Sequence, residues 1–197
     1  MDKNKSEIQR LVLEKASWIL KKQREYRDMT PQVIKPSFKE DTTLPYLGKN
    51  YPLTVNRNQA RNTIEMVDGK FVARLKPVKN SSNTLRKLFE NWIREKAQDV
   101  FKDKVKNYSK KLGASVERIV IKNHRNRWGS LTGKGIINLN LNLIKAPEDV
   151  IDYIILHELC HLKIKEHSHH YWDLVYNFMP NYHDKIDWLK VNGDNLL

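Results

Sequence analysis

The sequence of 197 residues predicts an α+β protein, in which a small antiparallel or mixed sheet packs on a helix near residues 149–162, after a basic N-terminal helix and β-hairpin part. Apolar residues recur with the 3.6-residue period of helices in some stretches and with the two-residue period of strands in others. The chain is also 40% hydrophobic and has five tryptophans, which is enough to build a core. We expect two parts, residues 1–82 and 83–197, that form one compact unit.

The first part is predicted to hold a helix and a β-element. Within residues 6–28, Ile8, Leu11 and Trp18 fall on one stripe of an amphipathic helix. The stretch PYLGKNYPLTVNRN (45–58) is expected to be extended. In TIEMVDGKFVARL (63–75), two alternating runs flank Asp-Gly, which is the strongest short signal for a β-hairpin.

The second part is predicted to begin with one long helix, because apolar residues keep a helical period from about Asn83 until Gly113. Strands are expected in SVERIVIKN (115–123), in RWGSL (127–131) and in IINLNLNL (136–143), where apolar residues alternate with asparagines, so that one face is buried and the other polar. Pro147, followed by two acids, marks the start of the helix DVIDYIILHELCHL, because acids favour a helix N-terminus.

The net charge of +13 is unevenly distributed along the chain. Residues 1–113 hold 26 Lys and Arg against 13 Asp and Glu, whereas residues 114–197 hold 10 of each. A basic N-terminal half attracts nucleic acid, anionic membrane surfaces or acidic substrates, and a solvated basic face is the simpler interpretation.

Neither a membrane span nor a secretory signal is evident in the sequence. It has no apolar stretch of about eighteen residues, and the start MDKNKSEIQR has no apolar core. The single cysteine, Cys160, excludes an internal disulfide and is expected to be a buried thiol. We therefore expect a cytoplasmic protein without membrane contact.

Five of the seven histidines lie in HELCHLKIKEHSHHYW (157–172). His157 and His161 are four residues apart, so about 40° separates them around a helix and both rings can reach one metal ion. Glu158 lies on the flank, about 100° from His157. This is the HExxH motif, in which two zinc ligands accompany a carboxylate that takes a proton from the metal-bound water.

A catalytic zinc ion usually has a third protein ligand, and His167 is the best candidate. On an unbroken helix it would lie about 15 Å from His157 along the axis, so the helix must end near residues 163–165 and the chain must turn back. Ser168 is expected to cap the next helix. The alternative ligands are His169, His170, His183 and, more weakly, Asp173.

The group that stabilises the oxyanion is left open by the sequence. His124 and Arg127 are the first candidates because they precede the strand region next to the helix, and Tyr153, Tyr171 and Tyr182 are chemically able. The asparagine face of residues 136–143 is a further candidate for pairing with a peptide by strand addition, although structural use is the simpler interpretation. Metzincins share the histidine spacing but carry glycine where this chain has Ile164, which argues against that class.

The stretch NRWGSLTGKGIINLNLNLIKAPEDVIDYIILHELCHLKIKEHSHHYWDLVYNFMPNY resembles the YgjP-like predicted metal-dependent hydrolases, which are related to SprT-like and minigluzincin proteins. The resemblance rests on RWGS, the asparagine-bearing strand, HELCHL and the HS-aromatic segment, and it extends over most of residues 8–190. It implies a zincin-like core, a Zn²⁺ cofactor held by His157, His161 and His167, and Glu158 as general base. Two departures are Leu131, where members usually have cysteine, and a short start before the Trp18 helix.

Three function hypotheses follow from these patterns. The first is a zinc-dependent metallopeptidase acting on a peptide or protein. The second is a zinc hydrolase of a non-peptide substrate such as a nucleotide phosphoanhydride. The third is a nucleic-acid-associated module with a structural zinc, which would use the basic N-terminal half.

Overall fold

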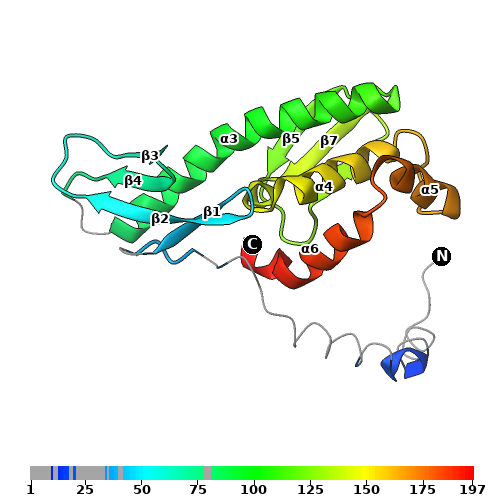
Figure 1. Cartoon of the computed structure of the whole chain (residues 1–197), viewed down its shortest axis with the longest axis horizontal. Helices are drawn as coiled ribbons and strands as arrows, with labels where there is room; N and C mark the ends of the chain where they lie inside the picture. Colours follow the sequence, from blue (N-terminus) through cyan, green and yellow to red (C-terminus); the bar gives the residue numbers. More distant parts are fainter. Residues whose placement is uncertain are drawn as a thin grey trace.

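The structure, a computed structural model, describes residues 42–77 and 81–197, together with residues 10, 13–17, 20, 34 and 36–39. The helix predicted over residues 6–28 lies largely outside these residues. The described part is α+β: two small mixed sheets are joined by one long helix, and three shorter helices follow the second sheet, of which the first packs on it (Figure 1). This confirms the predicted fold class.

The N-terminal sheet has the strand order β1-β2-β4-β3, formed by Thr43–Tyr46, Lys49–Asn56, Lys70–Arg74 and Thr63–Val67. Strands β2 and β4 are parallel, and the other pairs are antiparallel. The predicted hairpin is confirmed: Asp68 and Gly69 have φ of 48° and 73°, as a two-residue type I′ turn requires.

The prediction of a single extended segment over residues 45–58 was wrong. Its first half makes a second tight hairpin between β1 and β2, with φ of 46° at Leu47 and 78° at Gly48. Leucine rarely adopts a positive φ, so the pair Leu-Gly gives a weak turn signal. Tertiary contacts support the turn: the N–H groups of Leu47 and Gly48 donate to the carbonyl oxygens of Ile144 and Lys145, each at 3.0 Å.

Replacing Gly48 by alanine is expected to destabilise the protein by about 2–4 kcal/mol. A β-carbon at this position would lie 2.7 Å from Cγ and 2.8 Å from Cα of Pro147, and a backbone atom cannot move aside cheaply. The measurement is the free energy of unfolding in urea. Gly69→Ala is the matched control, because Gly69 also has a positive φ but no atom within 4 Å of the added carbon. Equal losses in both variants would refute the steric argument.

Helix α3 (Ser81–Leu112) is the predicted long helix, and it ends at Gly113, which has φ 57°. In Figure 1 it runs along the top of the molecule from the N-terminal sheet to the second sheet. Its first half belongs to an aromatic cluster, in which Phe71 lies 5.5 Å from Phe89 and 4.9 Å from Trp92 between ring centroids. Its second half packs on α4, where Lys104 Nζ lies 2.9 Å from Asp152.

The second sheet has the order β5-β7-β6, formed by Arg118–Lys122, Ile136–Asn140 and Gly129–Leu131. Strand β7 pairs with β5 in parallel and with β6 antiparallel. The predicted strand through residue 143 is too long. Leu141–Lys145 form a 3₁₀ helix, η1, whose start is fixed by Asn140, because its side-chain oxygen accepts from the N–H of Asn142 at 3.1 Å.

Helices α4 (Glu148–Cys160), α5 (His169–Phe178) and α6 (Tyr182–Leu196) complete the fold. Helix α4 lies between α3 and the two C-terminal helices, and residues on most of its sides are buried (Figure 1). Ser168 stands at the N-cap of α5 as predicted, but its side chain makes no capping hydrogen bond. Among the described residues, no helix combines the length and apolarity needed to cross a bilayer.

Candidate metal centre

Three histidines converge at the C-terminal end of α4. His157 lies in the last turn of the helix, and His161 is its C-cap. The chain then turns back, as predicted, and brings His167 to the same place. One ring nitrogen from each of the three lies within 4.8 Å of the others, and the Nε2 atoms of His157 and His167 are 3.2 Å apart.

The sharp turn forms without a glycine at residue 164. The carbonyl oxygen of Cys160 accepts from the N–H groups of both Lys163 and Ile164, each at 3.0 Å. The ring Nδ1 of His161 lies 3.2 Å from the Ile164 carbonyl oxygen, and Lys163 Nζ donates to the Gly113 carbonyl at 3.0 Å. No residue of this turn has a positive φ, so the turn needs no glycine, and hydrogen bonds on both sides stabilise it.

The donor set fits a tetrahedral metal ion. Two nitrogens bound to zinc at 2.0–2.1 Å in tetrahedral geometry lie about 3.3 Å apart, close to the 3.2 Å between His157 and His167. Because His161 places Nδ1 against a carbonyl, this nitrogen carries the proton and Nε2 is free to bind a metal. The three side chains could thus hold one divalent ion.

Aromatic side chains fix the imidazole rings in this arrangement. The ring of Tyr171 stacks on His161 with a centroid distance of 4.7 Å, and Trp172 stacks on His167 at 5.5 Å. The Tyr171 hydroxyl donates to the carbonyl oxygen of His157 at 2.8 Å. Both tyrosine and tryptophan come from α5, so this helix orients the rings of α4 and the turn.

Burial and the neighbouring histidines favour the neutral imidazoles of His157 and His167. Burial, together with the neighbouring His161 and His167, lowers the pKa of His157 to about 4. The pKa of His167 is lowered by desolvation and by His161. A neutral imidazole offers a lone pair to a metal ion, whereas a protonated one does not.

Glu158 lies beside the three histidines and is only 7% exposed. Burial raises the pKa of its carboxyl group to about 7, although the nearby positive charge of Arg127 opposes this shift. A carboxyl group with a pKa near neutrality can both accept and return a proton. This is the property that the sequence motif predicts for the residue at this position.

Gly129 at the start of β6 makes room for this carboxylate. A β-carbon on Gly129 would lie 2.7 Å from both Cγ and Oε1 of Glu158. Gly129 is not among the predicted site residues, because a glycine in a strand gives no sign of which side chain approaches it.

Gly129→Ala is expected to displace the Glu158 carboxylate and to lower kcat about 10- to 100-fold without loss of metal. The measurement combines hydrolysis rates with metal content. Gly133→Ala is the control from the same cleft, because a β-carbon there meets no atom within 4 Å. Unchanged hydrolysis in Gly129→Ala would show that this contact does not position the carboxylate.

A cleft of about 710 Å³ opens over the histidines and Glu158. One wall is β6 with the turn after it, and the other contains Leu162 and Lys165. Strand β6 is an edge strand, and β7 is central, with neighbours on both sides. The alternative that residues 136–143 pair with a peptide does not hold for β7, whereas β6, at the cleft, is an edge strand within the described residues.

Asn140 has the structural function that was the simpler interpretation of the asparagine pattern, although it does not lie on a polar face. It is fully buried, not part of a polar face, and its side-chain amide donates to the carbonyl oxygens of His124 at 2.8 Å and Arg127 at 2.9 Å. Its backbone N–H donates to Trp128 at 2.8 Å. Asn140 thus holds the loop that leads into β6 and carries Arg127 toward Glu158.

None of the five residues named as candidates for stabilising the oxyanion lines the cleft. The Tyr171 hydroxyl is engaged by the His157 carbonyl oxygen, and Tyr171 is fully buried. Tyr153 and Tyr182 stack on each other beneath the site and are 4% and 7% exposed. Lys165, which the sequence analysis passed over, is the cation that does line the cleft.

The other polar candidates lie outside the cluster. His169 is exposed, and its Nε2 lies 3.5 Å from Asp173, one turn further along α5. His183 packs its ring on Tyr182 at 4.1 Å. Cys160 is a free, fully buried thiol as expected, and burial raises its pKa to about 12.

An HExxH helix that opens into a cleft beside an edge strand is typical of metal-dependent hydrolases of the metallopeptidase type. The model of the family described as "YgjP-like, metallopeptidase domain" matches residues 1–192, and the chain belongs to this family.

A curated relative and two solved structures are similar over shorter stretches. The UTP pyrophosphatase of Escherichia coli K12 is 37% identical over 59 residues, which make up 30% of this chain and 35% of the relative. The zymogen of Pyrococcus abyssi abylysin is 25% identical with a TM-score of 0.41, and covers 47% of this chain and 97% of its own. The zymogen of Methanocaldococcus jannaschii jannalysin is 30% identical with a TM-score of 0.38, and the match covers 44% of this chain and 83% of jannalysin.

Proposed function

We propose that the protein is a zinc-dependent hydrolase of peptides or proteins, in which His157, His161 and His167 hold the zinc ion and Glu158 is the general base. The observation that carries the proposal is the cluster of three imidazole nitrogens within 4.8 Å beside a buried carboxylate in an open cleft. A structural zinc site normally has four protein ligands. Three histidines with open space beside them favour a catalytic site.

Zinc, when bound, polarises a substrate oxygen and makes water more acidic. Glu158 then accepts the proton of the attacking water, which its pKa near 7 allows, and donates it to the leaving group. The stacked rings of Tyr171 and Trp172 keep the imidazoles in place during this transfer. Lys165 contributes a positive charge in the cleft.

The free edge of β6 supports a peptide substrate. This strand pairs with β7 on one side and contributes Gly129, Ser130 and Leu131 to the cleft on the other. An extended peptide can pair with such an edge through main-chain hydrogen bonds, which would hold a scissile bond beside Glu158. Protein or peptide is also the substrate class suggested by the metallopeptidase family.

A nucleotide phosphoanhydride is the second candidate substrate. The similarity to a protein named UTP pyrophosphatase favours it, as do the positive charges of Lys165 in the cleft and Arg127 near Glu158. A metal ion that polarises a carbonyl oxygen acts equally on a phosphoryl oxygen. The same three histidines and Glu158 would serve either reaction.

One screen separates these substrates. Zinc-loaded protein is incubated with casein and mixed peptides in one series, and with nucleoside triphosphates in a parallel series, each with a chelator control. Zinc-dependent release of new peptide termini alone supports the peptidase. Zinc-dependent release of pyrophosphate or phosphate alone rejects the peptidase in favour of the second candidate, and no hydrolysis in either series rejects both.

A further inference from the structure

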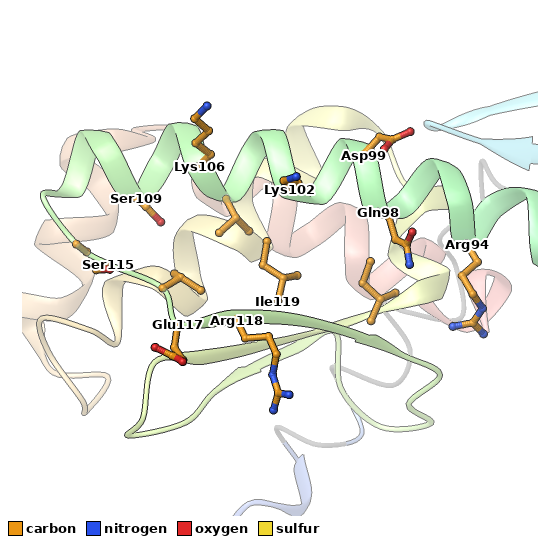
Figure 2. A pocket seen from close by; sticks show the side chains of 14 residues that line it. Arg94, Gln98, Asp99, Lys102, Lys106, Ser109, Ser115, Glu117, Arg118 and Ile119 are labelled. Atoms are coloured by element: carbon orange, nitrogen blue, oxygen red, sulfur yellow. The ribbon is translucent and has the colours of Figure 1, made fainter.

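A second hollow lies at the other edge of the second sheet, away from β6 and the metal centre. It is a groove of about 790 Å³ between α3 and β5, the edge strand farthest from β6 (Figure 2). Half-buried apolar side chains line it, and among them Ile119 and Ile121 of β5 face α3 beside the buried Val105. Figure 2 shows Gln98, Lys102 and Lys106 along the helix side.

The outer edge of β5 offers main-chain hydrogen bonds. The N–H of Glu117 donates to the Gly135 carbonyl at 2.9 Å, on the side of β7. Because N–H groups alternate along a strand, those of Arg118, Val120 and Lys122 point to the side that has no neighbouring strand within the described residues. Such an edge is a template for one more strand.

Positive charge surrounds this edge. Four cations line the groove against two acids, Asp99 and Glu117; the cations are Arg94, Lys102, Lys106 and Arg118. Within the described part of the chain, none of the four cations makes an ion pair. Lys122 adds another exposed cation at the end of β5. An acidic chain is thus favoured over a neutral one.

We propose that the groove between α3 and β5 binds an extended, acidic segment of a partner protein as an additional strand next to β5. The apolar lining takes every second side chain of the segment on the α3 side, and Arg118 and Lys122, on the other face of β5, meet its acids, while the α3 cations add to the positive charge around the groove. Pairing with β5 of a second copy of the protein is disfavoured, because Arg118 and Lys122 of the two copies would lie close together and repel each other. No aromatic side chain lines the groove to stack bases, so single-stranded nucleic acid fits less well.

The test uses the full-length protein and a fluorescein-labelled peptide of alternating valine and glutamate, long enough to pair along β5. We expect saturable binding in fluorescence polarisation, and slower amide hydrogen exchange at Arg118, Val120 and Lys122 in NMR spectra. A peptide of alternating valine and lysine, and a valine-glutamate peptide methylated on alternate backbone nitrogens, should bind at least about tenfold more weakly.

Two protein variants make the test specific. Lys102→Glu/Arg118→Glu reverses a charge on each side of the groove and should weaken binding about tenfold. Lys87→Glu/Lys134→Glu is the control, with the same charge change on exposed residues that do not line the groove. Val120→Pro removes an outward N–H without breaking the pairing with β7 and should also weaken binding.

The proposal is overturned if the lysine peptide binds as well as the glutamate peptide, if both charge variants behave alike, or if exchange at Arg118, Val120 and Lys122 does not change. Self-association that Val120→Pro abolishes would identify a second copy as the occupant. Displacement of the peptide by a single-stranded oligonucleotide of higher affinity would identify nucleic acid instead. Either result would reject the peptide partner.

Discussion

Replacing Glu158 by glutamine is expected to lower hydrolysis about 10²- to 10⁴-fold while zinc stays bound, because the amide cannot accept a proton from water. The two side chains have nearly the same shape, so the cleft beside Gly129 should be preserved. The carboxylate is also 7% exposed, and a neutral amide is easier to bury, so the folded protein should not lose stability. The measurement is kcat on whichever substrate the screen identifies, with zinc content determined in parallel.

Glu166→Gln is the matched control for this variant. Glu166 lies in the turn before His167 but is exposed and does not line the cleft. It should hydrolyse substrate at the wild-type rate. Retained activity in Glu158→Gln would reject the general-base assignment, whereas loss of both activity and zinc would mean that Glu158 contributes to metal binding instead.

Replacing His167 by alanine is expected to abolish stoichiometric zinc binding. The variant keeps only the two histidines of α4, and loss of a direct ligand costs more than the roughly 10- to 100-fold in affinity that outer-sphere changes cost. Wild type purified without chelator should hold about one zinc per chain, as a single three-histidine site requires. Elemental mass spectrometry on both proteins measures the difference.

His170→Ala is the control for the metal measurement, because His170 is an exposed histidine only three residues away and outside the cluster. It should retain zinc. Equal zinc content in His167→Ala and wild type would reject the three-histidine site. Wild type that holds no zinc and takes up none would reject the proposed enzyme as a whole.

The elements that were predicted correctly have strong local signals. Asp68-Gly69 specifies a hairpin by its own backbone preferences, and Gly113 ends α3 in the same way. The errors arose where tertiary contacts override local preference. Leu47-Gly48 turns because it docks on η1, and the strand stops at Asn140, whose side chain caps η1 and also bonds to the loop before β6.

The candidate site could be predicted in its residues but not in its surroundings. The spacing of His157 and His161 places them on one face of any helix. His167 would be too far from His157 on an unbroken helix, so a turn between them was predicted, and the structure contains it. The contact of Gly129 with Glu158 joins residues 29 positions apart, and no local pattern reveals it. The cleft residue Lys165 was passed over because an isolated lysine in a turn has no distinguishing pattern.

The length of α3 has a consequence for how the molecule comes apart. Phe89 and Trp92 of α3 pack against the N-terminal sheet, and Lys104 of the same helix contacts α4, while the buried residues form one continuous core. We therefore expect that neither half keeps its core intact when it is excised at either end of α3. We expect that unfolding of the N-terminal sheet also unfolds α3 and the metal centre. Limited proteolysis should then show the intact chain and small peptides, without a stable folded fragment.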